Sequence, residues 1–440
     1  MEQVKIGLFF QNYVPLLFAQ QNPNLDFYYF IGEDSDVRPE VEKILPREKL
    51  IFFKLGPRSD YRSDCESEAI IKQSNLTNLI KENKINYLVP SIYSSRFFYN
   101  WGRENGVKII FTDYKDKILE NKLYFDRFLE KNDLPKPKSF VFNYSKSATL
   151  PGEGRFVIQD PGSSGGSGTF FVNAQKEIEN LIKEKKIKIN HNYLAREFIE
   201  GKSYGITVFI APGLIALSAA RRQCFYTISP EIKKFAGIQW VGNDLPNSVL
   251  QKIEQTFLKI GDLFYQKKFF GFANFDFMID NHENIFLIEC NPRISAATAH
   301  LLKYPQLISN LPVGQLFIES FLEQKEYLLI KKHFPCPHDP FAGSVLNLCV
   351  FAEEKKKVTV KNRYSNGYYF PEGNQLNFSS FDIRKMGQKE KELVFFSQAK
   401  IGQTYKETST VAYTLSNYPL FDQKGEINED GKQVLETFKY

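Results

Sequence analysis

Over the first 115 residues, short apolar runs alternate with stretches whose apolar residues recur at helical spacing. This alternation of strand and helix is typical of an α/β layer built on a mainly parallel sheet. The expected strands are Val4 to Phe10, Asp26 to Ile31, and residues 51–55, 86–90 and 108–112, with helices near 14–20, 69–82 and 97–105. No glycine-rich dinucleotide motif follows the first strand, so the pattern favours a sheet domain without a nucleotide of its own.

In the middle of the chain, amphipathic helices are set between pairs of strands. The helices are expected over residues 116–132, 248–266 and 301–322, the last with breaks at Pro305 and near Pro312. The strand pairs are expected over residues 156–172, 193–210 and 271–291. The pattern therefore predicts a mixed α+β region that follows the parallel sheet.

From residue 331 the chain is punctuated by proline and carries many short strand-like runs. These features predict a small β-rich C-terminal domain. We therefore expect three parts: an N-terminal Rossmann-like domain over residues 1–115, a two-subdomain α+β region over 116–330, and the β-rich domain over 331–440. No motif in the last part indicates its role.

Composition narrows the class of protein. The 440 residues include 57 Lys and Arg against 51 Asp and Glu, a formal charge of +6 without a dense basic run. This excess suits small anionic ligands and argues against nucleic acid as a partner. The five Cys are odd in number and scattered, which favours a reducing cytoplasm. With no leader and no apolar run of bilayer length, we expect a soluble cytoplasmic protein without a membrane partner.

The most informative stretch is the strand pair from Gly271 to Asn291. Asp276 lies in its first strand and Glu289 near the end of its second, with a tight polar turn over Asn281 to Asn284. A hairpin brings these two carboxylates together, and two like charges repel unless a cation lies between them. Asn291 adds a neutral oxygen. Hard oxygen ligands of this kind predict a Mg²⁺ site, with Mn²⁺ as the alternative metal.

A second informative stretch joins the strands within residues 156–172. The turn between them contains Ser163, Ser164, Gly165, Gly166, Ser167 and Gly168. Glycines allow backbone N–H groups to turn toward one side and cradle phosphate oxygens, and the serine hydroxyls add donors. The alternative is a flexible hairpin loop with no ligand.

The run FDF, followed thirteen residues after its Asp by the Glu of IECNPR, resembles the metal-binding end of the ATP-grasp ligases. The resemblance implies that ATP and Mg²⁺ are bound, with Asp276, Glu289 and Asn291 as metal ligands. It implies that Arg293 is a catalytic cation beside the transferred phosphoryl group. The likeness covers residues 1–325, with residues 135–200 as a lid subdomain.

The resemblance also implies the nucleotide contacts. Lys122 would reach the α-phosphate, and the Gly/Ser turn would close over the β- and γ-phosphates. The backbone around Glu197 and Ile199 would bind the adenine edge, with Phe198 between them. Arg221 is a further catalytic candidate, because it could contact phosphates or a carboxylate substrate, although adjacent arginines are also common on surfaces.

Two positions depart from the family pattern. Gln159 stands where many members carry a lysine, and Arg196 stands where an acid often lies. Losing the lysine removes a charge-assisted hydrogen bond, worth ~1.5–3 kcal/mol, unless another cation supplies it. Arg221, Arg222 and Lys202 are the candidates for that cation.

The sequence thus predicts a ligase that activates a substrate carboxylate as an acyl phosphate and joins it to an amine, with amino acids or peptides favoured. Biotin carboxylase is the weaker match, because that enzyme places a Glu shortly after its Arg, whereas Ile, Ser and Ala follow Arg293 here. One rival is a nucleotide-binding regulatory or scaffold protein that has lost turnover, and another is a phosphotransferase. The expected partners are small molecules, and a homodimer is left open.

Overall fold

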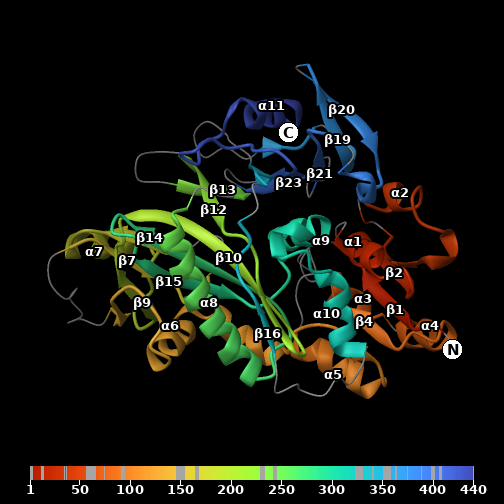
Figure 1. The fold of residues 1–440 in the computed structure, drawn as a ribbon, viewed down its shortest axis with the longest axis horizontal. Helices are drawn as coiled ribbons and strands as arrows, with labels where there is room; N and C mark the ends of the chain where they lie inside the picture. Colours follow the sequence, from red (N-terminus) through yellow and green to blue (C-terminus); the bar gives the residue numbers. More distant parts are fainter. Residues whose placement is uncertain are drawn as a thin grey trace.

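Figure 1 shows the fold as a computed structural model, in which the N-terminal sheet and a smaller lid sheet lie on opposite sides of a long central sheet. The structure describes residues 3–10, 14–33, 35, 37–55, 66–73, 75–90, 95–144, 154–163, 168–227, 233–240, 245–322, 331–338, 341–349, 358–361, 364–373, 375–387, 389–397, 402–405 and 409–439. No helix in these ranges has both the length and the hydropathy to cross a membrane.

The N-terminal sheet has five parallel strands in the order β3-β2-β1-β4-β5. Its elements are β1 (Lys5–Phe9), α1 (Val14–Gln21), β2 (Asp26–Gly32), α2 (Arg38–Val41), η1 (Arg47–Lys49), β3 (Leu50–Phe53), α3 (Glu66–Ile71), α4 (Leu76–Glu82), β4 (Tyr87–Val89), α5 (Arg96–Glu104) and β5 (Lys108–Ile109). The prediction of a parallel α/β layer is confirmed, although the helix expected over 69–82 is two short helices. Phe9 contacts Phe30 and Phe98 with ring centroids 5.3 and 5.4 Å apart, which joins the sheet to α5.

The lid sheet has four antiparallel strands in the order β6-β9-β7-β8. Its elements are β6 (Ser139–Asn143), β7 (Phe156–Gln159), β8 (Thr169–Val172), α7 (Gln175–Lys183) and β9 (Asn192–Glu197). A small core of its own, which includes Phe142, Ile158, Ile178 and Tyr193, holds α7 against the sheet.

The central sheet carries the acidic hairpin at one edge. Among the described residues it runs in the order β15-β14-β10-β12-β13-β17-β23-β21-β19-β20, with β11 paired to β10 and β16 paired to β11. The first part comprises β10 (Gly201–Ala211), β11 (Leu214–Leu217), β12 (Arg221–Thr227), β13 (Lys233–Trp240), α8 (Asn247–Gln266), β14 (Gly271–Asp280), β15 (Ile285–Asn291), α9 (Ala296–Lys303), η5 (Pro305–Ile308), α10 (Val313–Leu322) and β16 (Lys332–Phe334). Phe257 of α8 packs on Phe275 and Phe277 of β14, which supports the strand that carries Asp276.

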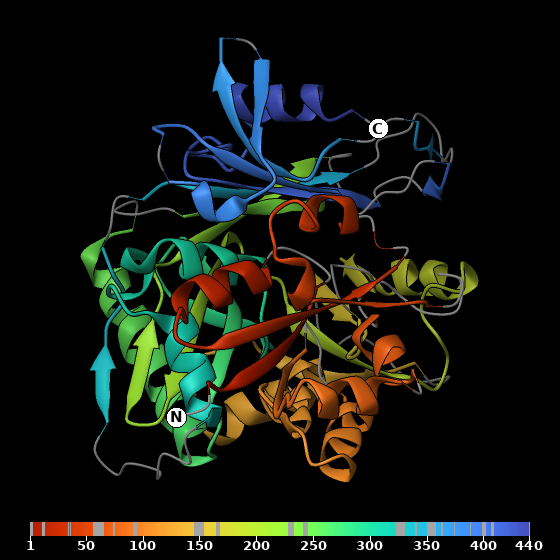
Figure 2. The same cartoon turned by 90° about the vertical axis from the view of Figure 1, so that its right-hand side faces the viewer.

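The C-terminal residues form the expected strands, but these extend the central sheet. β13 pairs with β17 over Gly237–Gln239, so the sheet continues without a break. The elements are β17 (Ser344–Cys349), β18 (Val358–Thr359), β19 (Gly367–Glu372), β20 (Gln375–Ser380), η6 (Ile383–Lys385), β21 (Leu393–Ser397), β22 (Thr404–Tyr405), β23 (Thr410–Ser416) and α11 (Glu429–Thr437). Figure 2 shows this C-terminal part beside the N-terminal α2. The domain boundary at residue 331 remains a prediction.

The helix expected over residues 116–132 is interrupted at Asn121. A 3-10 segment, η4 (Tyr114–Glu120), precedes α6 (Lys122–Lys131). The Asn121 side chain accepts a hydrogen bond from the amide of Tyr124 and so caps α6, which is a favoured way to begin a helix. The Lys122 amide donates to the Pro161 carbonyl at 3.1 Å. The interruption therefore anchors Lys122 beside the Gly/Ser turn.

Candidate active site

A cavity of about 630 Å³ lies where the lid sheet, α6 and the acidic edge of the central sheet meet, a size that suits a small-molecule ligand. Ten predicted site residues line it: Lys122, Gln159, Ser163, Glu197, Phe198, Ile199, Asp276, Glu289, Asn291 and Arg293. Ser164, Gly165, Gly166 and Ser167 lie outside the described residues. The remaining lining residues are Pro137, Val157, Thr169, Phe171, Arg196, Ser203, Gln223, Phe225, Lys234, Phe235, Met278 and Ile288.

The acidic end of the cavity comes from the register of the β14–β15 hairpin. Asp276 lies directly opposite Glu289, and Asn274 opposite Asn291, with an irregularity just after Asp276. Burial, followed by the charge of Glu289, raises the pKa of Asp276 to about 6, while Arg221 and Arg293 act in the opposite direction. Two carboxylates held this close favour a cation between them.

Asn291 and Arg293 follow the acidic pair on the same edge. The Arg293 guanidinium donates from Nη2 to Asn291 Oδ1 at 3.0 Å and from Nε to Glu120 Oε1 at 2.7 Å. Glu120 ends η4, so this ion pair ties the segment before α6 to the hairpin. Two bonds to one guanidinium restrict its rotamers, and Arg293 is therefore a well-oriented cation at the cavity wall.

The donor set fits Mg²⁺. It consists of two carboxylates and one amide oxygen, and Mg²⁺ usually takes few protein ligands because it retains waters and substrate phosphates. Within the described ranges, three or more His, Cys, Asp and Glu side chains never gather as a metal-binding group. A cage made of protein ligands alone is therefore not seen there, and a metal at Asp276 and Glu289 needs additional ligands from its substrate.

Lys122 connects the hairpin with the Gly/Ser turn. Its Nζ donates to the Ser163 carbonyl at 2.6 Å and lies 3.7 Å from Glu289 Oε2. Only 3% of the side chain is exposed. A buried ammonium of this kind is costly unless anions satisfy it. Lys122 thus carries a charge that faces both the acidic pair and the turn.

The described ends of the Gly/Ser turn are held in shape by Asp160. The Asp160 amide donates to the Gly168 carbonyl at 2.8 Å, and Ser163 Oγ donates to the Asp160 carbonyl at 2.9 Å. Gly168 has φ of +75°, a left-handed conformation that favours glycine. A Cβ there would lie 3.0 Å from the Asp160 Cβ. Gly168 itself closes the turn and is not a lining residue.

The opposite end of the cavity is apolar and lies at the connection from β9 to β10. Phe198 contacts Phe171 edge to face at 6.0 Å, and the Arg155 guanidinium covers the Phe198 ring at 4.0 Å. Glu197 accepts a hydrogen bond from the Lys138 amide through Oε1 at 3.0 Å. This wall suits a flat ring, as expected for the predicted adenine site.

Arg221 and Arg222 begin β12. Arg221 lies beneath the cavity and donates to Thr207 Oγ1 at 3.1 Å and Asn274 Oδ1 at 3.3 Å. Burial lowers its pKa to about 10, against the pull of Asp276. Among the described lining residues neither arginine appears, and a direct substrate contact by Arg221 stays a prediction.

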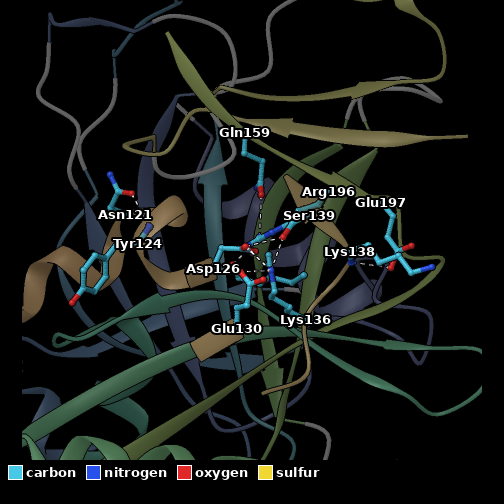
Figure 3. A network of polar contacts seen from close by, with 11 residues as sticks. Asn121, Tyr124, Asp126, Glu130, Lys136, Lys138, Ser139, Gln159, Arg196 and Glu197 are labelled. Carbon is cyan, nitrogen blue, oxygen red and sulfur yellow. Dashed lines mark hydrogen bonds and ion pairs between the residues drawn. The ribbon is translucent and has the colours of Figure 1, made fainter. Parts of the chain in front are cut away.

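The cation beside Gln159 is Arg196, which the sequence marked only as a departure from the family pattern. Arg196 Nη1 donates to Gln159 Oε1 at 3.2 Å and to the Ile288 carbonyl at 2.9 Å. Its Nη2 lies 3.4 Å from Asp126 Oδ1. Figure 3 shows Arg196 between Gln159 and Asp126, which come from β7 and α6. None of the three expected substitutes, Arg221, Arg222 and Lys202, is among the described lining residues.

Comparisons with known proteins agree with this geometry. Residues 119–297 match the family model described as an ATP-grasp domain. No curated protein sequence matches the chain.

Among solved structures, the chain is similar to the biotin carboxylase domain of 2-oxoglutarate carboxylase from Hydrogenobacter thermophilus, a dimer in complex with MgADP, ADP and bicarbonate. The TM-score is 0.63 at 12% identity, over 95% of this chain and 87% of that one. Biotin carboxylase from Campylobacter jejuni, in a β,γ-ATP complex, gives a TM-score of 0.60 at 11% identity, over 94% and 87%.

A third similar structure is carboxyaminoimidazole ribonucleotide synthase from Aspergillus clavatus in complex with ATP. Its TM-score is 0.56 at 11% identity, over 99% of this chain and 97% of that one. At these identities the likeness concerns the fold. The chain therefore contains an ATP-grasp domain over residues 119–297 and has the fold that this family shares.

Proposed function

We propose that this protein is an ATP-dependent ligase that activates a substrate carboxylate as an acyl phosphate and joins it to an amine, with release of ADP and phosphate. The observation that carries the proposal is the pairing of Asp276 with Glu289 across one hairpin, with Lys122 and Arg293 on the same cavity. Paired acids flanked by fixed cations suit phosphoryl transfer, which depends mainly on positioning and charge neutralisation.

Asp276, Glu289 and Asn291 would hold Mg²⁺, which when bound neutralises charge on the phosphates of ATP. Arg293 stabilises negative charge on the transferred phosphoryl group, because its two hydrogen bonds hold the guanidinium at the cavity wall. Lys122 orients the phosphates from the side of the turn. The described residues that line the cavity include no Cys or His, in keeping with direct attack by the substrate carboxylate.

The apolar wall formed by Phe171, Phe198 and Met278 supports an adenine site at the far end of the cavity. Stacking on such side chains orients the ring and leaves its edge for the backbone of Glu197 to Ile199. The proposed nucleotide then extends from this wall toward Lys122 and the acidic hairpin.

An amine is favoured over bicarbonate as the second substrate because of the residues that follow Arg293. Ile294 is buried, Ser295 caps α9, and the helix continues with Ala296 and Ala297. None of them is an acid that could activate bicarbonate, the role that the biotin carboxylase resemblance assigns to a Glu. Amino acids and small peptides are the substrates to test first.

Gln159 favours a second candidate, a nucleotide-binding protein that does not turn over. An amide in place of a lysine leaves less positive charge to offset the negative charge of the phosphates. This weakens binding of the ground state and of the transition state together. In that case ATP and its metal bind, but no combination of carboxylate and amine leads to the release of ADP. A homodimer, the state of the similar Hydrogenobacter thermophilus domain, belongs to the same proposal.

The test is Mg²⁺-dependent ATP binding by calorimetry, followed by ADP release with a panel of amino acids and small carboxylates. Glu289→Gln should abolish the metal dependence of binding. Glu283→Gln, in the turn of the same hairpin and outside the described lining residues, serves as the matched control and should leave it unchanged.

Loss of metal dependence in Glu289→Gln alone supports the site, and ADP release that requires both a carboxylate and an amine supports the ligase. A wild-type protein that binds no ATP would overturn the proposal. ATP binding without release across the panel favours the second candidate.

A further inference from the structure

The side chain of Gln159 has its orientation determined by Arg196. A guanidinium carries only donors, so the group of Gln159 that faces Arg196 Nη1 at 3.2 Å is the amide oxygen. The amide nitrogen then points toward Thr169 Oγ1, at 3.5 Å, the outer limit of a hydrogen bond. Gln159 and Thr169 both line the cavity. The Gln159 amide therefore presents N–H donors at the cavity side.

Arg196 carries a buried charge that its protein partners satisfy only in part. Its side chain is 2% exposed, and its Nε has no hydrogen-bond partner among the residues that the structure describes. Asp126, its one ion-pair partner among the described residues, lies 3.4 Å away and is closer to Lys136, at 2.7 Å. Ser139 also donates to that carboxylate at 2.7 Å. Two cations thus share one buried anion.

The Arg196 charge lies at the cavity, where the carboxylate of Glu289 offsets it in part. Arg196, Lys122 and Gln159 all line it, and burial of an incompletely paired cation is costly unless an anion approaches. Because Arg196 is buried, a lower effective dielectric constant strengthens its interaction with such an anion. Arg196 also donates to the carbonyl of Ile288, the residue before Glu289. The charge is therefore held between the lid sheet and the acidic hairpin.

We propose that Arg196 and Gln159 form a phosphate-binding pair that recognises the diphosphate or triphosphate of a nucleotide: the Gln159 amide donates to a phosphate oxygen, and Arg196 orients that amide and supplies the charge. Where the family pattern that this sequence resembles has a lysine on the strand equivalent to β7, the cation here is Arg196 on the neighbouring β9. Gln159 is the binding residue and Arg196 a positioning residue. The inference rests on the proposed function, because it takes a nucleotide as the ligand.

The pair differs from a purely structural network in what it recognises. Loss of a purely structural contact lowers the stability of the protein and affects the binding of every ligand equally. Loss of a phosphate-binding contact affects the binding of ADP, AMP and adenosine to different extents. Affinity for adenosine thus serves as the internal reference. The experiment measures dissociation constants for ADP and adenosine by calorimetry, and melting temperatures without ligand, for wild type and variants.

Arg196→Met should weaken ADP binding by about tenfold or more, the loss expected for a charge-assisted hydrogen bond, and leave adenosine binding within about twofold. Lys136 remains as the partner of Asp126 in this variant. Adding Gln159→Lys to Arg196→Met should restore ADP binding, because the cation returns to β7. Gln159→Lys alone should give no gain, since two cations would then be in contact.

Two further variants keep the test decisive. Gln159→Glu retains an acceptor for Arg196, so the fold is maintained, and it should lose ADP binding by about tenfold or more while adenosine binding is unchanged. Arg222→Met is the matched control, because Arg222 is also buried but is absent from the described cavity lining. It should lower the melting temperature without changing the ratio of ADP to adenosine affinity.

The inference is overturned if Arg196→Met and Gln159→Glu keep the wild-type ratio of ADP to adenosine affinity, or if the double variant folds but does not recover ADP binding. The wild-type measurement separates the two proposals. A wild type that binds no ADP removes the proposed function, and this inference with it, whereas normal wild-type binding with an unchanged ratio in the variants removes the inference alone.

Discussion

His300 should make the protein sensitive to acid. The Trp240 indole donates to His300 Nδ1 at 3.0 Å, and His300 Nε2 lies 3.1 Å from the Ser416 carbonyl. The neutral ring, with its proton on Nε2, satisfies both partners. A proton added at Nδ1 would face the indole N–H, and the ring is 1% exposed. Burial, reinforced by Arg221, lowers the pKa of His300 from 6.5 to about 4.

Because the pKa of the folded state lies below that of the unfolded state, the unfolded state binds the proton first. The contribution of His300 to stability is complete above pH 6.5 and is lost as the pH falls from 6.5 through 4. The loss reaches about 3 kcal/mol at the lowest pH and about 2 kcal/mol at pH 5. It would loosen the junction of α9, β13 and β23, which supply the His300 ring, the Trp240 indole and the Ser416 carbonyl.

The perturbation is His300→Gln, which keeps a donor for the Ser416 carbonyl and removes the titration. Leaving the Trp240 N–H without its acceptor should cost about 1–3 kcal/mol at every pH. Urea unfolding of both proteins at pH 7.5 and pH 5 should show that wild type loses about 2 kcal/mol more than the variant. Equal losses, or an NMR titration in which His300 protonates near pH 6.5, would refute the reasoning.

Three further predictions concern the scaffold of the site. Asp276→Asn should raise the melting temperature of the metal-free protein at pH 7 by an amount equivalent to about 3 kcal/mol, because a pKa raised to about 6 by burial and Glu289 means that ionisation above pH 4 costs stability; an unchanged melting temperature contradicts the repulsion. Phe257→Ala, at a fully buried ring against β14, should cost about 3–5 kcal/mol in denaturant unfolding, and Phe257→Leu distinctly less. Asn121→Ala should cost about 1 kcal/mol through loss of the α6 cap, while Asn121→Asp retains it, as thermal melting followed by circular dichroism would show.

Local patterns were sufficient to predict much of the fold and the acidic hairpin. The alternation of apolar residues over Gly271 to Asp280 and the turn over Asn281 to Asn284 define both strands, and a tight turn sets their register. That register pairs Asp276 with Glu289. Ten predicted site residues line one cavity. Asp276 lies within β14 and Lys122 begins α6, and the resemblance to the ATP-grasp ligases, rather than periodicity, indicated Lys122 as a site residue.

What the sequence alone determined is therefore the type and order of the elements and the acids that face one another across a short turn. Only the tertiary structure decided that Arg221 is buried beneath the cavity, and that Arg196 contacts Gln159 and Asp126 from two other elements. It also decided that the C-terminal strands continue the central sheet through β13 and β17. Periodicity reports which face of an element is apolar, but the partner of a buried charge or a sheet edge depends on contacts between residues far apart in the chain.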